Sequence, residues 1–300
     1  MEELLRVGAC SMAAIPGDID TNLENIKNWT LKGADESVEI LLFPELSLSG
    51  YWTRSELHYE AQKLSGPAIN ELINFLQDID SNIRISVGLA ESHAGCLYNT
   101  QVILDGNQGV IGFYRKTHWP SAEVETWGCG NHYPLNRIKG INVGTAICYD
   151  NNFPEVHRTY GLKGADLVLS PYAYGHKFDY DDQKSVELAI SKWKDKEKMF
   201  LCAAAAANYL WIAAVVGAGH VKDYMADDAP DEGFQSWFPG VILFIAPDGK
   251  VVKESSDDQI KEQILYYDIS KFTNLEHRKG GNNYFKNRRV STYKEILELP

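Results

Sequence analysis

The feature that most constrains this chain is the stretch of residues 141–171, in which two apolar runs enclose a helical segment. Residues 141–147 (INVGTAI) are typical of a buried strand, and Cys148 stands where this strand ends. Pro154 suits the first turn of a helix, and the second apolar run, residues 165–171, predicts another strand. A strand, a helix and a strand in this order are typical of an α/β protein.

Cys148 alone is weak evidence for catalysis, because free cysteine is also among the most buried residue types. The positive end of a helix at this strand exit would favour a thiolate. A cysteine becomes a nucleophile when a base or a positive charge lies nearby. Two charged residues also follow apolar runs, Glu45 after LLFP and Lys116 after IGFYR. We therefore expect Glu45, Lys116 and Cys148 to share the rim of one sheet.

Length, composition and charge restrict the class of protein. With 300 residues, 44% of them hydrophobic, the chain can build one large domain or two small ones, and we find no repeat or low-complexity linker. A net charge of −12 argues against nucleic-acid and anionic-membrane partners. Five cysteines without a C-x-x-C pair argue against a disulfide framework or a structural zinc site. With no signal peptide in evidence, we expect a cytoplasmic protein.

The pattern along the chain predicts strands alternating with helices, in one α/β domain with two sheets covered by helices. A capping box at Thr21 and Glu24 predicts the start of the first helix. Residues 202–219 carry almost no charge, and we interpret them as a helix end leading into a buried strand and not as a membrane span. Expected strands are residues 4–11, 38–44, 83–90, 100–104, 110–114, 141–147, 165–171, 211–216, 241–246, 250–253 and 262–269; expected helices begin near residues 18, 66, 154 and 181.

Three sequence blocks carry a family resemblance. Residues 43–51 read FPELSLSGY, residues 114–118 read YRKTH, and residues 148–155 read CYDNNFPE. In order and separation they resemble the signature blocks of the carbon–nitrogen hydrolase (nitrilase) superfamily, in its amidase and N-carbamoyl amidohydrolase-like branch. Further matches are LYNT at 97–100, Asn208, FPG at 238–240 and PDG at 247–249, so that the resemblance spans about residues 5 to 270.

The resemblance implies an α-β-β-α sandwich, with two central mixed sheets covered by helices. It implies a Glu-Lys-Cys triad, here Glu45, Lys116 and Cys148. We expect a catalytic domain over residues 1–275 and a C-terminal arm over residues 276–300, which is charged and aromatic. Relatives commonly pair through helices near the nucleophile and exchange such arms, so the resemblance also implies a homodimer or a higher homo-oligomer.

A second glutamate after the lysine is also implied. In many relatives this glutamate precedes an aromatic residue by four positions and a glycine by seven. Glu123 meets both conditions, with Trp127 and Gly130. Glu125 is the rival if the short loop is aligned differently, and we prefer Glu123.

The implied chemistry accounts for these residue types. Glu45 as general base would take the thiol proton of Cys148, and the thiolate would attack a carboxamide carbon. The Lys116 ammonium and the backbone N–H of Tyr149 would donate hydrogen bonds to the oxyanion, and losing one such donor typically costs about 10²–10³ in rate. Glu123 would hold Lys116 or orient the substrate. The expected enzyme is an amidohydrolase acting on linear amides through a thioester, with no metal or organic cofactor.

The residues after the nucleophile bear on the substrate. Cys148, Tyr149 and Asp150 differ from the Cys-Trp-Glu of true nitrilases and favour amides over nitriles. N-carbamoyl-D-amino-acid hydrolases carry two arginines, which bind the substrate carboxylate, where this chain has Asn151 and Asn152. The neutral side chain of asparagine cannot replace the positive charge of arginine. We therefore expect a small neutral amide. The candidate substrate-binding residues are Tyr51, Trp119, Tyr149, Asn151, Asn152, Tyr172 and Tyr174.

Several alternatives stay open. An N-carbamoyl amino acid or amine amidohydrolase would keep the same triad. A glutaminase subunit would donate ammonia to a separate synthetase. A binding member of the fold would not turn substrate over, although it would have no reason to keep Glu45, Lys116 and Cys148 together. In a Cys-His hydrolase, a distant histidine would serve Cys148, and Lys116→Ala would keep most activity.

Overall fold

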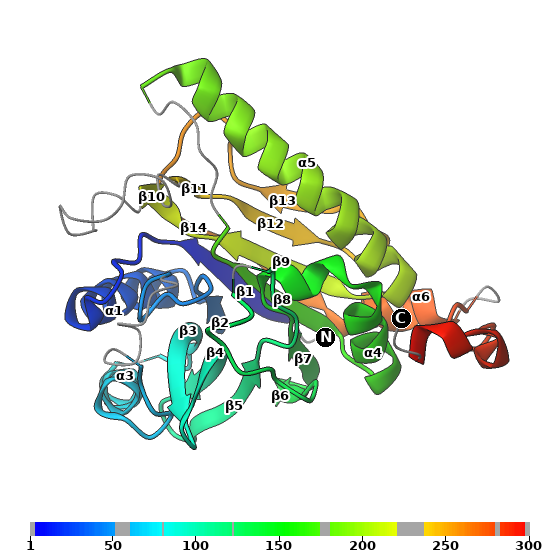
Figure 1. Cartoon of the computed structure of the whole chain (residues 1–300), viewed down its shortest axis with the longest axis horizontal. Helices are drawn as coiled ribbons and strands as arrows, with labels where there is room; N and C mark the ends of the chain where they lie inside the picture. The colour runs from blue at the N-terminus through cyan, green and yellow to red at the C-terminus, as the bar shows by residue number, and fades with distance from the viewer. Residues whose placement is uncertain are drawn as a thin grey trace.

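The computed structural model describes residues 4–51, 61–79, 81–121, 123–174, 181–220, 237–279 and 283–297. These residues form two six-stranded mixed sheets with helices packed against them, and a small two-stranded sheet (Figure 1). The α/β prediction is confirmed.

The first sheet has the strand order β14-β1-β2-β3-β4-β5. The three central strands β1, β2 and β3 are parallel, whereas β4, β5 and β14 join by antiparallel pairing. Helices α1 and α3 belong to this half of the molecule. The bounds are β1 (Leu4–Ser11), α1 (Ile19–Asp35), β2 (Ile40–Leu42), α3 (Pro67–Asp78), β3 (Arg84–His93), β4 (Cys96–Asp105), β5 (Gly109–Arg115) and β14 (Gln263–Ser270).

The second sheet has the strand order β13-β12-β9-β8-β7-β6, with β7, β8 and β9 parallel. The parallel strands are joined through α4 and α5, as the alternating pattern of the sequence predicts. The bounds are β6 (Asn136–Ile138), β7 (Ile141–Thr145), α4 (Pro154–Lys163), β8 (Leu167–Tyr172), α5 (Gln183–Asn208), β9 (Trp211–Val216), β10 (Ala218–His220), β11 (Trp237–Pro239), β12 (Ile242–Ile245) and β13 (Val251–Glu254).

Three buried apolar clusters set the order of the layers. One cluster joins the two sheets, with Leu5 and Val7 of β1 in the same core as Val143, Leu169 and Val215 of the second sheet. Another packs α1 and α3 onto the outer face of the first sheet. The sequence of layers is therefore helix, sheet, sheet, helix, as the resemblance implies.

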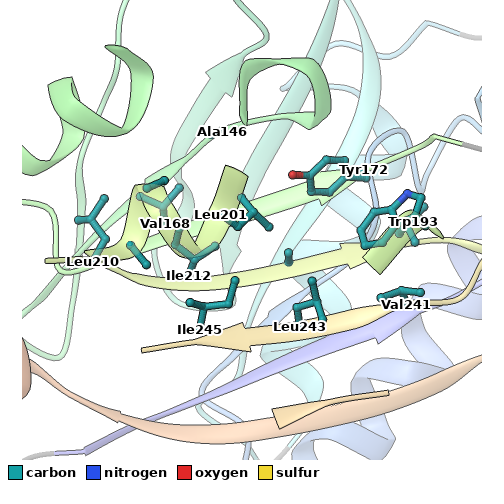
Figure 2. Close-up of a cluster of buried hydrophobic side chains, with 14 of the residues drawn as sticks. Ala146, Val168, Tyr172, Trp193, Leu201, Leu210, Ile212, Val241, Leu243 and Ile245 are labelled. Atoms are coloured by element: carbon teal, nitrogen blue, oxygen red, sulfur yellow. The ribbon is translucent and has the colours of Figure 1, made fainter. Parts of the chain in front are cut away.

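The third cluster lies between α5 and the outer face of the second sheet (Figure 2). Trp193 and Leu201 of α5 pack with Ile212 and Leu243 of neighbouring strands. Burial of a large apolar side chain stabilises a fold by about 1.5–3 kcal/mol, so a helix of this length is held mainly by its apolar face.

The first helix begins near residue 18, as predicted, but its capping residue differs from the predicted one. The side chain of Asp18 accepts hydrogen bonds from the N–H and hydroxyl of Thr21 at 3.0 and 2.8 Å, so Asp18 caps α1 and Thr21 already lies inside it. Residues 202–219 contain the end of α5 and all of β9, as predicted. Within the described parts of the chain, no helix combines the length and the apolar composition needed to cross a bilayer.

The tail begins with α6 (Lys271–Lys279) and continues into two short 3₁₀ helices, η3 (Val290–Thr292) and η4 (Lys294–Leu297). The ring of Tyr284 stacks on Tyr209 with centroids 5.5 Å apart, and Phe285 meets the same ring edge-on. The tail therefore packs on its own chain near the end of α5. Its role as an arm to a second subunit stays a prediction.

Candidate active site

The three candidate residues come from the ends of strands in both sheets. Glu45 follows β2 by three residues and Lys116 follows β5 directly, so both belong to the first sheet. Cys148 follows β7 of the second sheet by three residues. The expectation that all three share the rim of one sheet is therefore wrong. They meet because the two sheets are packed face to face.

The loop that carries Glu45 is fastened to β3. The Leu48 N–H donates to the Gly88 carbonyl oxygen at 2.8 Å, and the Gly88 N–H donates to the Ser47 hydroxyl oxygen at 3.1 Å. A Cβ at Gly88 would lie 2.3 Å from the nitrogen of Leu46. Only glycine allows this close approach, so β3 determines where Glu45 stands.

The Glu45 side chain is fully buried, and its carboxylate accepts three hydrogen bonds. Oε1 accepts from the Asn99 side-chain amide at 2.7 Å and from the Lys116 ammonium at 2.8 Å. Oε2 accepts from the Ala173 backbone N–H at 2.6 Å. Donors from β4 and from the residues that directly follow β5 and β8 hold the carboxylate in place.

Lys116 lies between two buried carboxylates. Its side chain is fully buried, and Nζ is 2.8 Å from Glu45 Oε1 and 3.1 Å from Glu123 Oε2. Burial by itself lowers the pKa of Lys116, but Glu45, Cys148 and Glu123 outweigh burial and raise that pKa above its ordinary value. The ammonium also lies 5.0 Å from the ring centroid of Trp119. Lys116 is therefore a fixed positive charge.

The structure distinguishes Glu123 from Glu125 by position. Glu123 is buried, and its Oε1 accepts a hydrogen bond from the Tyr51 hydroxyl at 2.8 Å while Oε2 faces Lys116. Glu125 is exposed. Burial raises the pKa of Glu123, and the positive charge of Lys116 opposes that rise. Of the two carboxylates, only Glu123 is in contact with the Lys116 ammonium.

Cys148 begins a 3₁₀ turn, η1 (Cys148–Asn152), and has a left-handed backbone with φ of +48°. Such a conformation costs about 1–3 kcal/mol in a residue with a side chain and is often found at functional turns. Burial raises the pKa of the thiol, Glu45 raises it further, and Lys116 opposes both. Because α4 begins only at Pro154, the expectation that this helix end favours a thiolate is not supported.

Asn151 braces this turn. Its side-chain amide donates to the carbonyl oxygens of Ala146 and Cys148, both at 3.0 Å, and its Oδ1 accepts from the Ser170 hydroxyl at 2.9 Å. These contacts occupy the amide inside the protein. The Asn151 side chain therefore holds the backbone of Cys148 in place, and its contact with substrate stays a prediction.

Asp150 ties the lysine segment to the nucleophile turn. It is fully buried, and its Oδ1 accepts from the hydroxyl of Thr117 at 2.8 Å and the backbone N–H of His118 at 2.9 Å. Its Oδ2 accepts from the Tyr114 hydroxyl at 2.8 Å and the Ile147 N–H at 3.1 Å. One carboxylate therefore links the end of β5 to the exit of β7.

A sequence model of the carbon–nitrogen hydrolases matches residues 6–273. The chain belongs to the carbon–nitrogen hydrolase family. An (R)-stereoselective amidase from Pseudomonas sp. is 27% identical over 305 residues, which cover 99% of this chain and 96% of that enzyme.

Two solved structures share the fold. A carbon–nitrogen hydrolase from Helicobacter pylori G27 has a TM-score of 0.83 at 20% identity, with 99% of each chain covered. An amidase mutant from Nesterenkonia sp. AN1, in which acrylamide has added to the active-site cysteine, has a TM-score of 0.74 at 20% identity and covers 98% of this chain and 100% of that one.

A small cavity of this carbon–nitrogen hydrolase lies beside Glu45. Tyr51 and Tyr172 border it, together with Phe238, whose ring meets Tyr51 edge-on at a centroid distance of 6.4 Å. Two of the predicted aromatic walls therefore stand at the carboxylate. Their contact with a substrate stays a prediction.

The other predicted substrate-binding residues lie in different surroundings. Trp119 stacks on Trp127 and borders the lysine, whereas Tyr149 meets Phe153 edge-on at 5.3 Å. Asn152 is half-buried in η1. Tyr174 is exposed, with a lysine ammonium 4.3 Å from its ring centroid.

Two residues near the site had no role in the sequence prediction. Asn99 belongs to the LYNT block, but its contact with Glu45 joins residues 54 positions apart and leaves no local signal. Glu197 is a buried acid on α5, and it interrupts a run of apolar residues at helical spacing. A charged residue at a core-facing position of a helix could have been recognised from the sequence.

Across the described residues, no group of three or more His, Cys, Asp or Glu side chains is placed to hold a metal ion.

A larger hollow of about 370 Å³ lies elsewhere, between α4, α5 and the C-terminal segment. His157 and Met199 are among its walls, whereas Glu45, Lys116 and Cys148 are not. This hollow is therefore separate from the candidate active site.

Proposed function

We propose that this chain hydrolyses the C–N bond of a small linear amide through a thioester on Cys148, releasing ammonia and a carboxylic acid. The observation that carries the proposal is the Lys116 ammonium, buried between the carboxylates of Glu45 and Glu123 beside a thiol whose pKa is raised. A thiol with a raised pKa is neutral at rest, so it needs a base, and Glu45 is held in place to serve as one.

The reaction begins when Glu45 takes the thiol proton and the Cys148 sulfur attacks the amide carbon. The carbonyl oxygen becomes an oxyanion, to which the Lys116 ammonium and the Tyr149 N–H donate hydrogen bonds. Because Lys116 is already anchored, little reorganisation is needed as this charge develops. Glu123 holds the ammonium from its other side.

The intermediate collapses with cleavage of the C–N bond. Glu45 returns its proton to the nitrogen, and ammonia leaves while the acyl group stays on Cys148 as a thioester. Glu45 then takes a proton from water, whose oxygen attacks the thioester carbon. The carboxylic acid leaves and the thiol regains its proton, so the net consumption is one water per amide.

We also propose that the substrate carries no charged group next to the amide that reacts. Neither Asn151 nor Asn152 supplies the positive charge that a carboxylate beside the amide would need, and Asn151 is engaged with the protein backbone. An amidase among the relatives and the acrylamide adduct of the Nesterenkonia enzyme support a simple amide.

The test is ammonia release from a panel of short amides, glutamine, N-carbamoyl amino acids and a nitrile. Cys148→Ala should abolish release, and Cys96→Ala should not, because Cys96 is exposed on β4. Mass spectrometry should find an acyl group on Cys148 when turnover is stopped in acid. Amide turnover that survives Cys148→Ala would refute the proposal, and turnover of carbamoyl acids alone would refute the substrate class.

We also propose a homodimer that pairs through α4, α5 and the tail. Met199 and Ile296 are exposed apolar walls of the larger hollow, while both ring nitrogens of His157 are buried there without a hydrogen-bond partner among the described residues. Light scattering should report twice the chain mass, and Met199→Asp should weaken the pairing. A strict monomer at high concentration would contradict this assembly.

A further inference from the structure

Glu197 stands at a core-facing position of α5. Ile190, Trp193, Glu197 and Leu201 recur at intervals of three and four residues, and all four are buried. Glu197 is 2% exposed. A carboxylate placed among apolar side chains is costly unless a positive charge or hydrogen bonds offset its burial.

Lys196 and Tyr172, the polar neighbours of Glu197, offset only part of this cost. The Oε2 atom of Glu197 is buried without a hydrogen bond of ordinary geometry among the described residues. The Tyr172 hydroxyl, which interacts with this carboxylate, also lacks one. Lys196, whose side chain is 40% exposed, forms an ion pair with Oε1 at 3.6 Å, and its ammonium also lies over the ring of Tyr174. Burial raises the pKa of Glu197, while Tyr172 and Lys196 oppose that rise.

Glu197 adjoins the candidate active site through Tyr172. The Tyr172 ring borders the cavity at Glu45, and the next residue along the chain, Ala173, donates its N–H to Glu45. Trp193, one helical turn before Glu197, meets the Tyr172 ring edge-on at 5.2 Å (Figure 2). Helix α5 also packs against the turn that begins with Cys148.

We propose that Glu197 binds a protonated amino group of the substrate, with the Tyr172 hydroxyl beside it. The preferred substrate is then an amide that carries an amine at the end opposite to its reacting carbonyl. This inference rests on the proposed amidohydrolase function and names its substrate class. It also gives Oε2 of Glu197 the hydrogen-bond donor that it lacks among the described residues.

Binding of the amine has a consequence for the nucleophile. The negative charge of Glu197 is one of the charges that raise the pKa of the Cys148 thiol. An ammonium group at Glu197 would neutralise that charge and make the thiolate easier to form. The amine should therefore increase kcat as well as lower KM.

The experiment compares 5-aminopentanamide with hexanamide, in which a methyl group replaces the ammonium. The native enzyme should prefer the amino amide in kcat/KM. Glu197→Gln keeps the shape and removes the charge, so the preference should fall about 10- to 100-fold, the usual range for a lost charge-assisted contact. Glu187→Gln, on the exposed side of the same helix, should leave the preference unchanged.

Binding is measured separately on Cys148→Ala protein by calorimetry. The amino amide should bind more tightly than hexanamide, and adding Glu197→Gln should remove the difference. Equal binding of the two amides, or a difference that survives Glu197→Gln, overturns the inference. Loss of ammonia release with all amides, but preserved selective binding, would instead overturn the proposed function. If Glu197 only stabilises the fold, Glu197→Gln will lower the melting temperature and affect both amides equally.

Discussion

Two buried lysines, each paired with two acids, have different surroundings. The side chain of Lys116 is fully buried, and those of its partners Glu45 and Glu123 are 0% and 3% exposed. The side chain of Lys194 on α5 is 2% exposed, but those of its partners Glu254 and Asp257 are 37% and 57% exposed. The two clusters contain similar charges, and only one of them is closed to solvent.

The difference shows what burial of both partners does. Water screens the Lys194 cluster, and such pairs contribute roughly 0–1 kcal/mol, so this cluster serves to fasten α5 to the segment after β13. Charges in the Lys116 cluster act on one another with little screening. Removing one member leaves the others uncompensated. The fixed electrostatic field of the Lys116 cluster can stabilise charge that develops in a reaction, whereas burying these charges contributes little to the stability of the fold.

The largest expected effect comes from Glu45→Gln, which removes the base and keeps its shape. General-base catalysis contributes about 10²–10⁴ in rate, so ammonia release should fall by that factor. Glu254→Gln in the screened cluster should leave the rate unchanged. Steady-state kinetics on a short amide measure both variants, and equal rates for the native protein and Glu45→Gln would contradict the role of Glu45.

Lys116→Met should have the second largest effect on activity, because it removes an oxyanion donor worth about 10²–10³ in rate. It also leaves Glu45 and Glu123 buried without their cation, which should destabilise the fold by about 3–5 kcal/mol. Urea unfolding measures the stability and ammonia release the rate. Substantial activity in a folded Lys116→Met protein would favour the Cys-His alternative.

His157 extends the comparison to a buried titratable group whose ring nitrogens have no hydrogen-bond partner among the described residues. Burial lowers its pKa from 6.5 to about 4. The unfolded chain therefore binds the proton more tightly, so stability should decrease as the pH falls from 6.5 toward 4, by up to about 3 kcal/mol. The free energy of unfolding, measured at pH 7.5 and at 4.5, tests this prediction, and His157→Leu should reduce the difference between the two values. If the difference is the same in the His157→Leu protein, other groups control the pH dependence of stability.

The smallest effect is expected for Lys194→Met. Its acidic partners can turn to water, and the main loss is the hydrogen bond that its ammonium donates to the Ser255 carbonyl oxygen. The free energy of unfolding should fall by about 1 kcal/mol with no change in turnover. A loss comparable to that of Lys116→Met would remove the distinction between the clusters.

Local patterns account for what could be predicted. Periodicity and turn chemistry predicted three features: the strand before Cys148, the proline that starts α4 and the charge-free run after residue 202. Each of these signals extends over about one helix or strand. The family and the layer order followed from three motif blocks and are confirmed. Glu123 was preferred from its spacing to an aromatic residue and a glycine, and its catalytic role stays a prediction.

The sequence by itself determined the elements, the family and the residue types available for chemistry. Only the tertiary structure decided how they meet: Lys116 reaches Glu45 across 71 positions, and the Ala173 N–H reaches it across 128. The left-handed backbone of Cys148, the inward turn of Asn151 and the place of Glu197 beside Tyr172 depend on the packing of two sheets and a helix. Propensity and spacing act over a few residues, whereas burial and charge pairing act through space.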